Sequence, residues 1–452
     1  MGMQIAIITG EASGDRVGAQ LAQEIRRLRP DAALWGTGGA HLRAAGVELL
    51  VDSSRWGVIG VASGLRLIPR ILRAWRRLQR ELRERQPDVV VPIDAGAFNL
   101  GFFGLGGLCP WVRRNLPQTR ILYYFPPGSW RRTLNRTPLA PITDAVATPF
   151  PWNETELRRF GVNAHFVGHP LLDLAQPTQD PKAFADQYGL DLLHPTVGIF
   201  PGSRAQEIRQ ILPVQLAAAS LIHRRINGVQ FLIGLAPTVD RDEVIRLVRK
   251  EQEAHREHSA RFPQPEQTRS DDSGTARPIP IPVGGQDPVS EGELARRRKE
   301  WLERAADMPQ TQGDLPVALV EGATYDAMTA SDVLLITSGT ATLEAAILGK
   351  PMIITYRLSR NNFLEYLLVR RSIPRFIGMP NLLADRLICP EYIQDAATPE
   401  ALSDAVIDLL LEPDRMLRMR DDLRDAVSLL GEPGGAARTA KMVVELAEQG
   451  KR

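Results

Sequence analysis

The chain is poor in cysteine, with only Cys109 and Cys389 among its 452 residues. Two isolated cysteines give neither a disulfide framework nor the paired spacing of a zinc site, so we expect a reducing, cytoplasmic compartment. No stretch reaches the roughly 18 uncharged apolar residues that a transmembrane helix needs. The apolar residues 4–9 run directly into the polar segment 10–15, and they lack the basic start and the length of a signal peptide.

Excess charge is also lacking, because the formal net charge is only +2. A general nucleic-acid footprint is therefore not expected. Segment 64–86 is the exception, with eight arginines against two glutamates and a helical stripe of leucine, isoleucine and Trp75. We expect a surface helix that packs its apolar stripe on a sheet, and whose basic face could also rest on the anionic surface of an inner membrane.

The length of the chain predicts two domains of roughly 150–200 residues each. Apolar strands alternate with helical patterns, which indicates α/β domains with doubly wound parallel sheets. We place a first Rossmann-like domain at 1–175, a linker at 176–195, a second Rossmann-like domain at 196–430 and a C-terminal helix at 431–452. Within the second domain, the polar, Pro- and Gly-rich residues 251–314 are expected to form a disordered insertion. Two such domains leave a cleft in which a two-substrate enzyme could close.

The most informative motif is the sequence Ser-Gly-Thr-Ala-Thr-Leu-Glu-Ala-Ala at 338–346, which follows the apolar run 332–336. A buried strand, a small polar turn and a helix would place free N–H groups and a positive helix end at the sheet edge, where a diphosphate can bind. Glu344 lies one helical turn in, where its carboxylate could accept hydrogen bonds from ribose hydroxyls. An ordinary turn with Ser338 or Thr340 as the N-cap explains the stretch equally well.

Two further segments also favour a nucleotide-binding site. In the sequence Pro-Gly-Ser-Arg at 201–204, the backbone N–H groups of Gly202 and Ser203 and the guanidinium of Arg204 could bind phosphate oxygens. The side-chain amides of Asn381 and Gln394 present paired donors and acceptors that could read a uracil edge. Each of these residues, taken alone, is also typical of an ordinary cap or turn.

Taken together, these segments resemble the lipid-A-disaccharide synthase family, which has the GT-B architecture of two Rossmann-like domains facing across a cleft. The resemblance covers nearly the whole chain outside 251–314. Its matching segments, in chain order, are 10–15 (Gly-Glu-Ala-Ser-Gly-Asp), 36–39 with 44–46, 87–88 with 93–95 (Ile-Asp-Ala) and 98–100 (Phe-Asn-Leu), 166–170 (Phe-Val-Gly-His-Pro), 201–204, 338–344, 356–357, and 380–384 with 390–391 and 394.

The resemblance implies an inverting transfer of diacylglucosamine from UDP-2,3-diacylglucosamine to 2,3-diacylglucosamine 1-phosphate, without a metal or another cofactor. It implies a protein that works on the cytoplasmic face of the inner membrane and can form homodimers. The second domain would bind the nucleotide through Gly202, Ser203, Arg204, Ser338, Gly339, Thr340, Glu344, Asn381 and Gln394. The first domain would bind the lipid-linked acceptor through Ser13, Gly14, Asp15 and Asn99.

The chain departs from the family at the expected general base. The family carries Pro-Asp-Phe after the Ile-Asp-Ala strand, whereas this chain has Gly-Ala-Phe at 96–98, and Ala97 cannot accept a proton. Nearby groups that could act as the base are Glu11, Asp15, Asp94 and His169. We choose Glu11, because it follows the first strand, and place Asp94 beside it as the second catalytic residue. The alternatives are a related lipid acceptor, a non-catalytic UDP-sugar-binding relative, or a UDP-sugar epimerase of the same fold.

Overall fold

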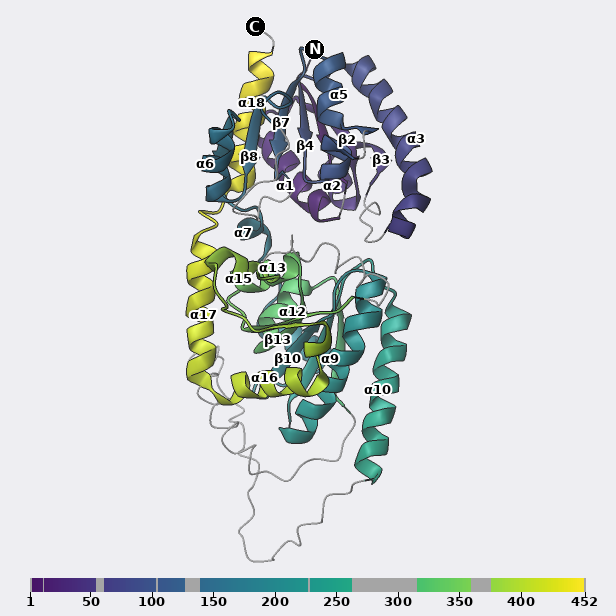
Figure 1. Ribbon diagram of the computed structural model, residues 1–452, viewed down its shortest axis with the longest axis vertical. Helices are drawn as coiled ribbons and strands as arrows, with labels where there is room; N and C mark the ends of the chain where they lie inside the picture. Colours follow the sequence, from purple (N-terminus) through teal and green to yellow (C-terminus); the bar gives the residue numbers. More distant parts are fainter. Residues whose placement is uncertain are drawn as a thin grey trace, which may run out of the picture. The chain divides into compact units, whose positions relative to one another are not determined.

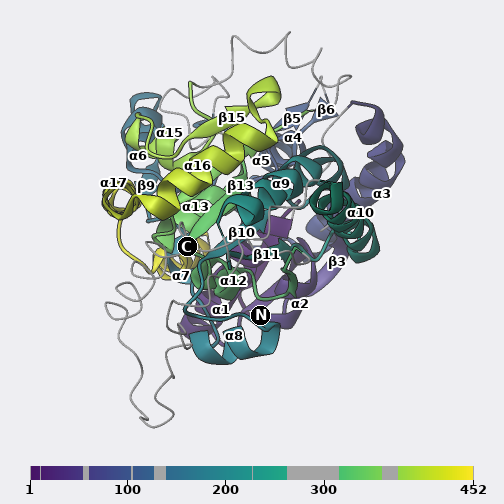
Figure 2. The same ribbon diagram turned by 90° about the horizontal axis from the view of Figure 1, so that it is seen from below.

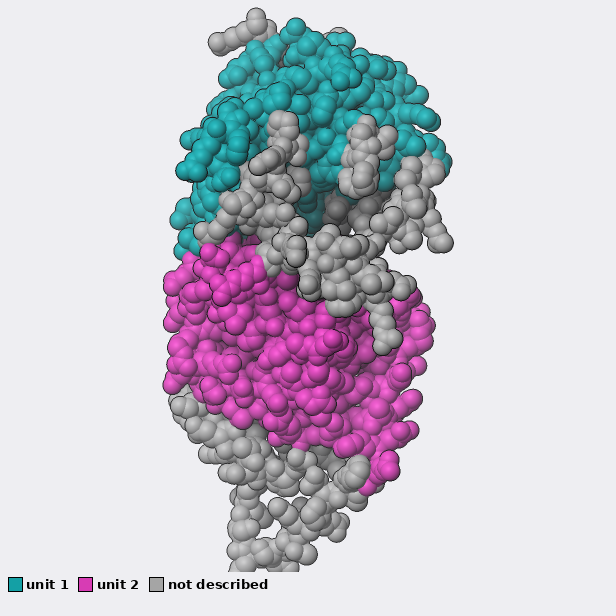
Figure 3. All heavy atoms as spheres, in the orientation of Figure 1, with its two compact units in different colours: residues 1–174, 428–452 teal, residues 175–427 magenta. Residues whose placement is uncertain are grey.

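The structure is a computed structural model that describes residues 2–10, 12–53, 61–102, 105–126, 139–226, 228–261, 315–358 and 375–450. The chain folds into two compact units, which Figure 3 shows in different colours. Unit 1 comprises residues 1–174 and 428–452, and unit 2 comprises residues 175–427. The chain therefore starts in unit 1, builds unit 2 and returns to unit 1 at its end.

Unit 1 is built on a parallel sheet with the strand order β3-β2-β1-β4-β7-β8-β9. The strands are β1 (Gln4–Ile8), β2 (Ala33–Gly38), β3 (Glu48–Asp52), β4 (Val89–Pro92), β7 (Arg120–Tyr124), β8 (Ala145–Thr148) and β9 (Ala164–Phe166). Strand β4 has the sequence Val-Val-Val-Pro and is buried along its whole length. Such unbroken apolar runs are typical of parallel strands that helices cover on both faces.

The helices of unit 1 form two layers around this sheet. They are α1 (Ala12–Leu28), α2 (Ala40–Ala44), α3 (Val61–Arg85), α4 (Gly96–Leu100), α5 (Leu108–Asn115), α6 (Pro151–Arg159), α7 (Leu171–Leu174) and α18 (Gly435–Gln449), with a small ribbon of β5 (Gly101–Phe102) and β6 (Leu105–Gly106). On one face, Leu21 of α1 and Val443 of α18 pack with Val91, and α18 lies beside α1 (Figure 1). On the other face, Leu82 of α3 and Val112 of α5 are completely buried, and each such side chain contributes about 1.5–3 kcal/mol.

Unit 2 contains a second parallel sheet, in the order β12-β11-β10-β13-β14-β15. Its strands are β10 (Thr196–Phe200), β11 (Gln230–Leu235), β12 (Val317–Glu321), β13 (Val333–Thr337), β14 (Met352–Tyr356) and β15 (Glu391–Ile393). Its helices are α8 (Pro181–Tyr188), α9 (Ala205–Arg225), α10 (Arg241–Arg261), α12 (Thr324–Ala330), α13 (Thr340–Ile347), α15 (Met379–Ala384), the short 3-10 helix η2 (Gln394–Ala396), α16 (Pro399–Leu411) and α17 (Pro413–Ser428). Helices α9 and α16 lie side by side (Figure 2).

The two parallel α/β units confirm the predicted fold class, whereas three segments differ from the sequence-based expectation. Residues 176–195, expected as a linker, belong to unit 2 and contain α8, whose N-terminal N–H groups are capped by Asp180. The C-terminal helix α18 belongs to unit 1, because it packs on α1. Residues 251–261 complete α10 and are therefore not part of an insertion. The remaining residues of the expected insertion, 262–314, lie outside the described residues.

Candidate functional site

Both sheets place the sequence motifs at the same topological position. Numbered along each sheet, the strands run in the order 3-2-1-4-5-6-7 in unit 1 and 3-2-1-4-5-6 in unit 2. The order reverses between β1 and β4 in unit 1 and between β10 and β13 in unit 2. Ligands of such sheets bind at the carboxyl ends of the strands that flank this point. In unit 2 the loops after those strands contain residues 201–204 and 338–339, and in unit 1 they contain the described residues 9–10 and 93–95.

In unit 2, the loop after β10 ends in a turn that begins helix α9. The backbone N–H groups of Ser203 and Arg204 donate hydrogen bonds to Oε2 of Glu207, at 2.9 and 3.1 Å. Nη1 of Arg204 donates to Oε1 of the same carboxylate at 2.8 Å, and the hydroxyl of Thr238 donates to the Ser203 carbonyl at 2.5 Å. Two of the groups that the sequence predicts to hold a phosphate, the Ser203 N–H and the Arg204 guanidinium, therefore already hold an anion, which is a carboxylate of the protein itself.

This turn is closely fitted to the carboxylate. Gly202 has a φ of +117°, and a Cβ atom at this position would lie 2.3 Å from Oε2 of Glu207. Only glycine satisfies both the backbone conformation and the close approach. The charges of Glu207 and Arg204 also act on Tyr356, at the end of β14. Burial raises the pKa of the Tyr356 hydroxyl, the Glu207 carboxylate raises this pKa further, and Arg204 lowers it.

The loop after β13 is tied to helix α15. The hydroxyl of Ser338 donates to the carbonyl of Ile377 at 2.7 Å. The hydroxyl of Thr342 donates to the carbonyl of Gly339 at 2.8 Å and accepts the N–H of Met379 at 3.1 Å. The first turn of α13 is thus fixed by side-chain hydroxyls, and the predicted contact of this turn with a diphosphate stays a prediction.

The N-terminal end of helix α13 is exposed to solvent, whereas its acidic residue, Glu344, is buried in the protein interior. Thr340 is exposed at the N-terminal end of the helix. The Glu344 residue is only 9% exposed, and Oε1 accepts a hydrogen bond from the hydroxyl of Tyr325 at 2.8 Å. Glu344 therefore anchors α13 to α12 in this structure, and its contact with a ribose stays a prediction.

Asn381 has a structural role that the sequence did not predict. It is completely buried, and its Nδ2 donates to the carbonyl of Cys389 and to Oε1 of Glu391 at 2.7 and 2.8 Å. Its Oδ1 accepts the N–H groups of Ile388 and Cys389 at 2.7 and 2.8 Å. Because the amide has two donors and two lone pairs, these four bonds use its whole capacity. Asn381 therefore holds the loop between α15 and β15 in this structure, and its contact with a uracil edge stays a prediction.

Gln394, unlike Asn381, does not use the whole hydrogen-bonding capacity of its amide in the described structure. It follows β15 with a φ of +54°, and its Oε1 accepts the N–H of Leu358 at 3.3 Å. Its Nε2 is buried and has no hydrogen-bond partner among the described residues. A buried donor of this kind is costly to leave unpaired, so Gln394 keeps the donor that its predicted role in base recognition requires.

In unit 1, Asp15 caps a neighbouring helix. The residue is 3% exposed, and its carboxylate accepts the N–H groups of Gly39, His41 and Leu42 at 2.6, 3.0 and 3.2 Å. These groups lie at the start of α2, where a negative charge is favourable. Asp15 therefore caps α2 in this structure, and its roles in acceptor binding and as a base candidate stay predictions.

The turn after β4 is strained. Asp94 and Ala95 have φ values of +47° and +45°, a region that non-glycine residues rarely adopt and that often marks functional sites. The carbonyl of Asp94 accepts hydrogen bonds from the Tyr123 hydroxyl at 2.7 Å and from Nδ2 of Asn99 at 2.8 Å. Asn99 is completely buried. It therefore supports the turn from inside in this structure, and its contact with an acceptor stays a prediction.

The remaining candidates of unit 1 differ in exposure. Ser13 is exposed at the start of α1, whereas Gly14 is buried, and a Cβ on Gly14 would lie 3.4 Å from Thr9. Ala97 is exposed on α4. Contact of Ser13 and Gly14 with an acceptor stays a prediction.

Two base candidates of the sequence analysis have different outcomes. His169 is buried among aromatic rings, with Phe125 and Phe150 each 5.3 Å away between ring centroids. Burial lowers the pKa of its imidazole to about 3, which makes it a weak base. Glu11 lies outside the described residues, so its catalytic role stays a prediction.

Sequence reasoning missed the residues that hold the predicted groups in place. Glu207 was overlooked, although it stands three residues after the N-cap Arg204, the spacing of a capping-box glutamate. Glu391 accepts the N–H groups of Ile377 and Gly378 at the start of α15. This second carboxylate had no local signal, because it lies 13 residues away in sequence from the helix end that it caps.

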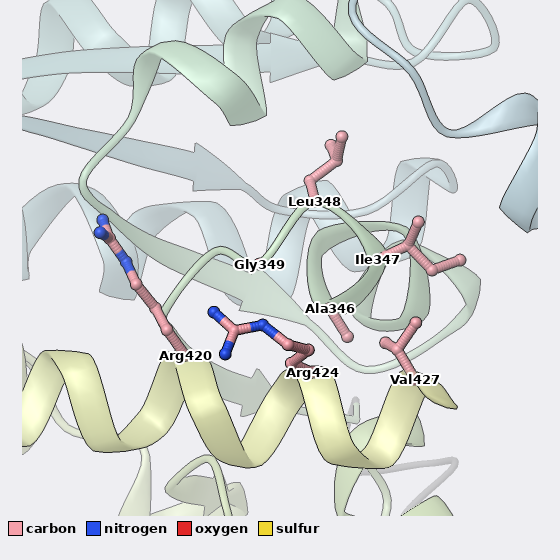
Figure 4. Close-up of a pocket in the computed structure, with 7 residues that line it drawn as sticks. All are labelled: Ala346, Ile347, Leu348, Gly349, Arg420, Arg424 and Val427. Atoms are coloured by element: carbon pink, nitrogen blue, oxygen red, sulfur yellow. The ribbon is translucent and has the colours of Figure 1, made fainter. Parts of the chain in front are cut away.

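A small cavity of about 240 Å³ lies elsewhere in unit 2, between the end of α13 and helix α17. Figure 4 shows Arg420 and Arg424 of α17 on one side and Leu348 and Gly349 on the other. Nη1 of Arg424 pairs with Asp421 at 2.9 Å. The cavity is at the C-terminal end of α13, away from the exposed start of this helix, and it contains none of the predicted site residues.

Comparison with known proteins decides the family. The family model described as lipid-A-disaccharide synthetase matches residues 5–267 and 297–445. The chain belongs to this family. A lipid-A-disaccharide synthase from Syntrophus aciditrophicus is 32% identical over 446 residues, which cover 98% of this chain and 97% of the relative. The family match confirms the resemblance that the motifs indicated, and it includes every segment that forms the two switch points.

Solved structures show the same architecture. A UDP co-structure of MnaA from S. aureus has a TM-score of 0.57 at 12% identity, covering 98% of this chain and 97% of that one. The calicheamicin glycosyltransferase CalG4 has a TM-score of 0.50 at 13% identity, covering 99% of both chains. Their likeness establishes the GT-B fold. Within the described part of the chain, none of the helices combines the length and the apolar character needed to cross a bilayer.

Proposed function

We propose that the protein transfers diacylglucosamine from UDP-2,3-diacylglucosamine to 2,3-diacylglucosamine 1-phosphate, with inversion at the anomeric carbon and release of UDP. Membership of the lipid-A-disaccharide synthetase family over nearly the whole chain supports the reaction. The observation that carries it is the anion-binding turn at residues 202–204, which lies at the switch point of unit 2 and binds a carboxylate there.

The proposed donor site belongs to unit 2. The turn before α9 supplies backbone N–H groups and the Arg204 guanidinium, and the exposed start of α13 at Gly339 and Thr340 supplies a second helix end. Fixed donors of this kind stabilise a leaving diphosphate as its charge develops. The unpaired Nε2 of Gln394 would donate to the uracil, and Glu344 would contact the ribose. No step of this scheme assigns a metal or a cofactor a role.

The proposed acceptor site belongs to unit 1. The strained turn at Asp94 and Ala95 fixes the backbone beside Gly10, since a Cβ on Gly10 would lie 2.7 Å from Cβ of Ala95. Such a rigid loop suits the positioning of a reacting hydroxyl. Glu11 would take the proton of that hydroxyl, and Asp94 would assist, while Ser13 and Gly14 contact the acceptor. A positioned base of this type contributes about 10²–10⁴ in rate.

We further propose that the protein works at the anionic surface of the inner membrane. Helix α3 buries Leu78 and Leu82 in unit 1 and exposes Arg73, Arg76 and Arg80 on its other side. Each basic residue near an anionic bilayer contributes roughly 1 kcal/mol of attraction. Sedimentation with vesicles that contain anionic lipid should show binding that weakens with salt, and equal binding to neutral vesicles would contradict this part of the proposal.

A second candidate function rests on one observation. Ala97 is exposed on α4 and replaces the aspartate that the family pattern carries, so the chain could bind a UDP-sugar without turning it over. The two functions are separated by incubating the purified protein with UDP-2,3-diacylglucosamine and 2,3-diacylglucosamine 1-phosphate, and by following UDP release beside calorimetry with UDP. Turnover supports transfer. Tight binding of UDP without turnover on this acceptor would support the binding function.

A further inference from the structure

The turn of unit 2 that we propose as a phosphate site holds a carboxylate of the protein itself. The N–H groups of Ser203 and Arg204 both point at Oε2 of Glu207, and Nη1 of Arg204 binds Oε1. The Glu207 side chain is only 10% exposed, whereas that of Arg204 is 41% exposed. A phosphate that approaches these N–H groups would meet a carboxylate in its place, and two anions cannot share the same donors without strong repulsion.

A capping box explains part of this geometry. In such a box, a glutamate at the third helical position binds the N–H of the N-cap residue. Here the same oxygen also binds the N–H of Ser203, which precedes the N-cap, and the other oxygen binds the guanidinium. Gly202 is shaped to admit this oxygen, since a Cβ would lie 2.3 Å from it. The carboxylate thus makes the contacts that a phosphate makes at the N-terminus of a helix.

We propose that Glu207 is a resident anion of the phosphate site, and that the diphosphate of the nucleotide displaces it from the N–H groups of Ser203 and Arg204. In the absence of nucleotide, Glu207 keeps the turn and Arg204 in place. When the nucleotide is bound, Arg204 exchanges the carboxylate for a phosphate. When the reaction is over, the return of Glu207 promotes the departure of UDP. The inference rests on the proposed function, because it names a positioning residue of the same donor site.

The exchange has a consequence that a purely structural cap lacks. An internal carboxylate competes with the diphosphate but not with the uridine part of the ligand. Removing its charge should therefore strengthen UDP binding while uridine binding stays the same. Because the competing charge is removed from the donors that the diphosphate would use, we expect Glu207→Gln to tighten UDP binding by about tenfold, mainly through slower dissociation.

The test measures UDP and uridine affinity by calorimetry, and UDP dissociation by stopped flow, in the full-length protein. Glu243→Gln is the matched control, because Glu243 forms a comparable ion pair with Arg209 of the same helix α9, at 2.6 Å. The control should leave the ratio of UDP to uridine affinity unchanged, and Glu207→Gln should raise it. Glu207→Asp, which keeps the charge but shortens the reach, gives a second variant and should also raise the ratio.

Two outcomes would overturn the inference in distinguishable ways. If Glu207→Gln weakens UDP binding or leaves the ratio as in wild type, Glu207 is only a cap or a support for Arg204, and the proposed function stands. If neither wild type nor any variant binds UDP, and UDP release from the donor is absent, the donor site and the exchange both fail. A higher ratio in Glu207→Gln and Glu207→Asp, with the control unchanged, supports the exchange.

Discussion

The two units share one sheet topology, but they shape their switch points by different means. In unit 2, a side-chain charge shapes the turn, because Glu207 binds two backbone N–H groups and Arg204. In unit 1, the backbone itself is held in a strained conformation at Asp94 and Ala95, and the polar groups of unit 1 support the Asp94 carbonyl. The first arrangement can exchange one anion for another. The second keeps a loop fixed through its backbone conformation.

A second difference concerns the acidic residue in the first turn of each unit's leading helix. Asp15 of α1 binds three N–H groups of a neighbouring helix and is 3% exposed. Glu207 of α9 binds its own turn and an exposed arginine. Similar positions in the sequence therefore lead to a structural carboxylate in unit 1 and to one within reach of a ligand in unit 2.

The largest effect should come from the predicted base of unit 1. We expect Glu11→Gln to lower kcat by about 10²–10⁴, because proton removal from the acceptor hydroxyl loses its base. UDP affinity should stay within about twofold of wild type, since the proposed nucleotide site lies in unit 2. Single-turnover kinetics and UDP calorimetry check this pair of values. Full activity in Glu11→Gln together with inactivity of Asp94→Asn would move the role to Asp94.

The next largest effect should come from the loss of the Arg204 guanidinium in unit 2. Arg204→Ala should weaken UDP binding by about 100-fold, because a charge-assisted contact to the diphosphate is lost. Arg209→Ala is the control: this arginine is on the same helix but pairs with Glu243, so UDP affinity should not change. The shift in melting temperature that UDP causes measures the UDP affinity of both variants. Equal affinities for the two variants would remove Arg204 from the donor site.

Asp15→Asn should act on the stability of unit 1 and leave nucleotide affinity unchanged. The neutral amide loses the charge that favours the helix start, and it offers one acceptor oxygen where the structure uses both. A loss of about 2 kcal/mol in unfolding free energy is expected. Asp31→Asn is the control, because the Asp31 side chain is 58% exposed and its loss should have no measurable effect on stability. Urea denaturation measures the unfolding free energy of both variants. An unchanged denaturation midpoint for Asp15→Asn would contradict the structural role of Asp15.

The sequence predicted the sheets well, because parallel strands buried on both faces leave unbroken apolar runs such as Val-Leu-Leu-Ile-Thr in β13. It also predicted that a strand precedes the motif at 338–346, but not the strand order that places this motif where the sheet order reverses. It could not predict how polar side chains use their hydrogen-bonding capacity. Asn381 was assigned to a base edge, yet its four partners come from backbone and carboxylate groups 7–10 residues away. Only the folded loop brings these groups together.

The C-terminal helix shows the same limit at the level of domains. The sequence predicted a helix within 431–452, and α18 is one. Its partner α1 lies more than 400 residues earlier, as the contact of Arg29 with Glu448 at 2.9 Å illustrates. Nothing local in residues 431–452 distinguishes packing on one unit from packing on the other. The same reason explains the error at 176–195, where a Pro- and Gln-rich composition concealed a capped helix.

The smallest effect should come from restoring the family's acidic residue in unit 1. Ala97 is exposed, so Ala97→Asp should change stability by less than about 0.5 kcal/mol. If Glu11 is the base, an added carboxylate at this position has no proton to take, and kcat should stay within about threefold of wild type. The double variant Glu11→Gln with Ala97→Asp sharpens the test. Recovery of most of the activity there would show that α4 can also place a base at the acceptor, as the family pattern does. No recovery would mean that the fixed turn at Asp94 and Ala95 directs position 97 away from the reacting hydroxyl.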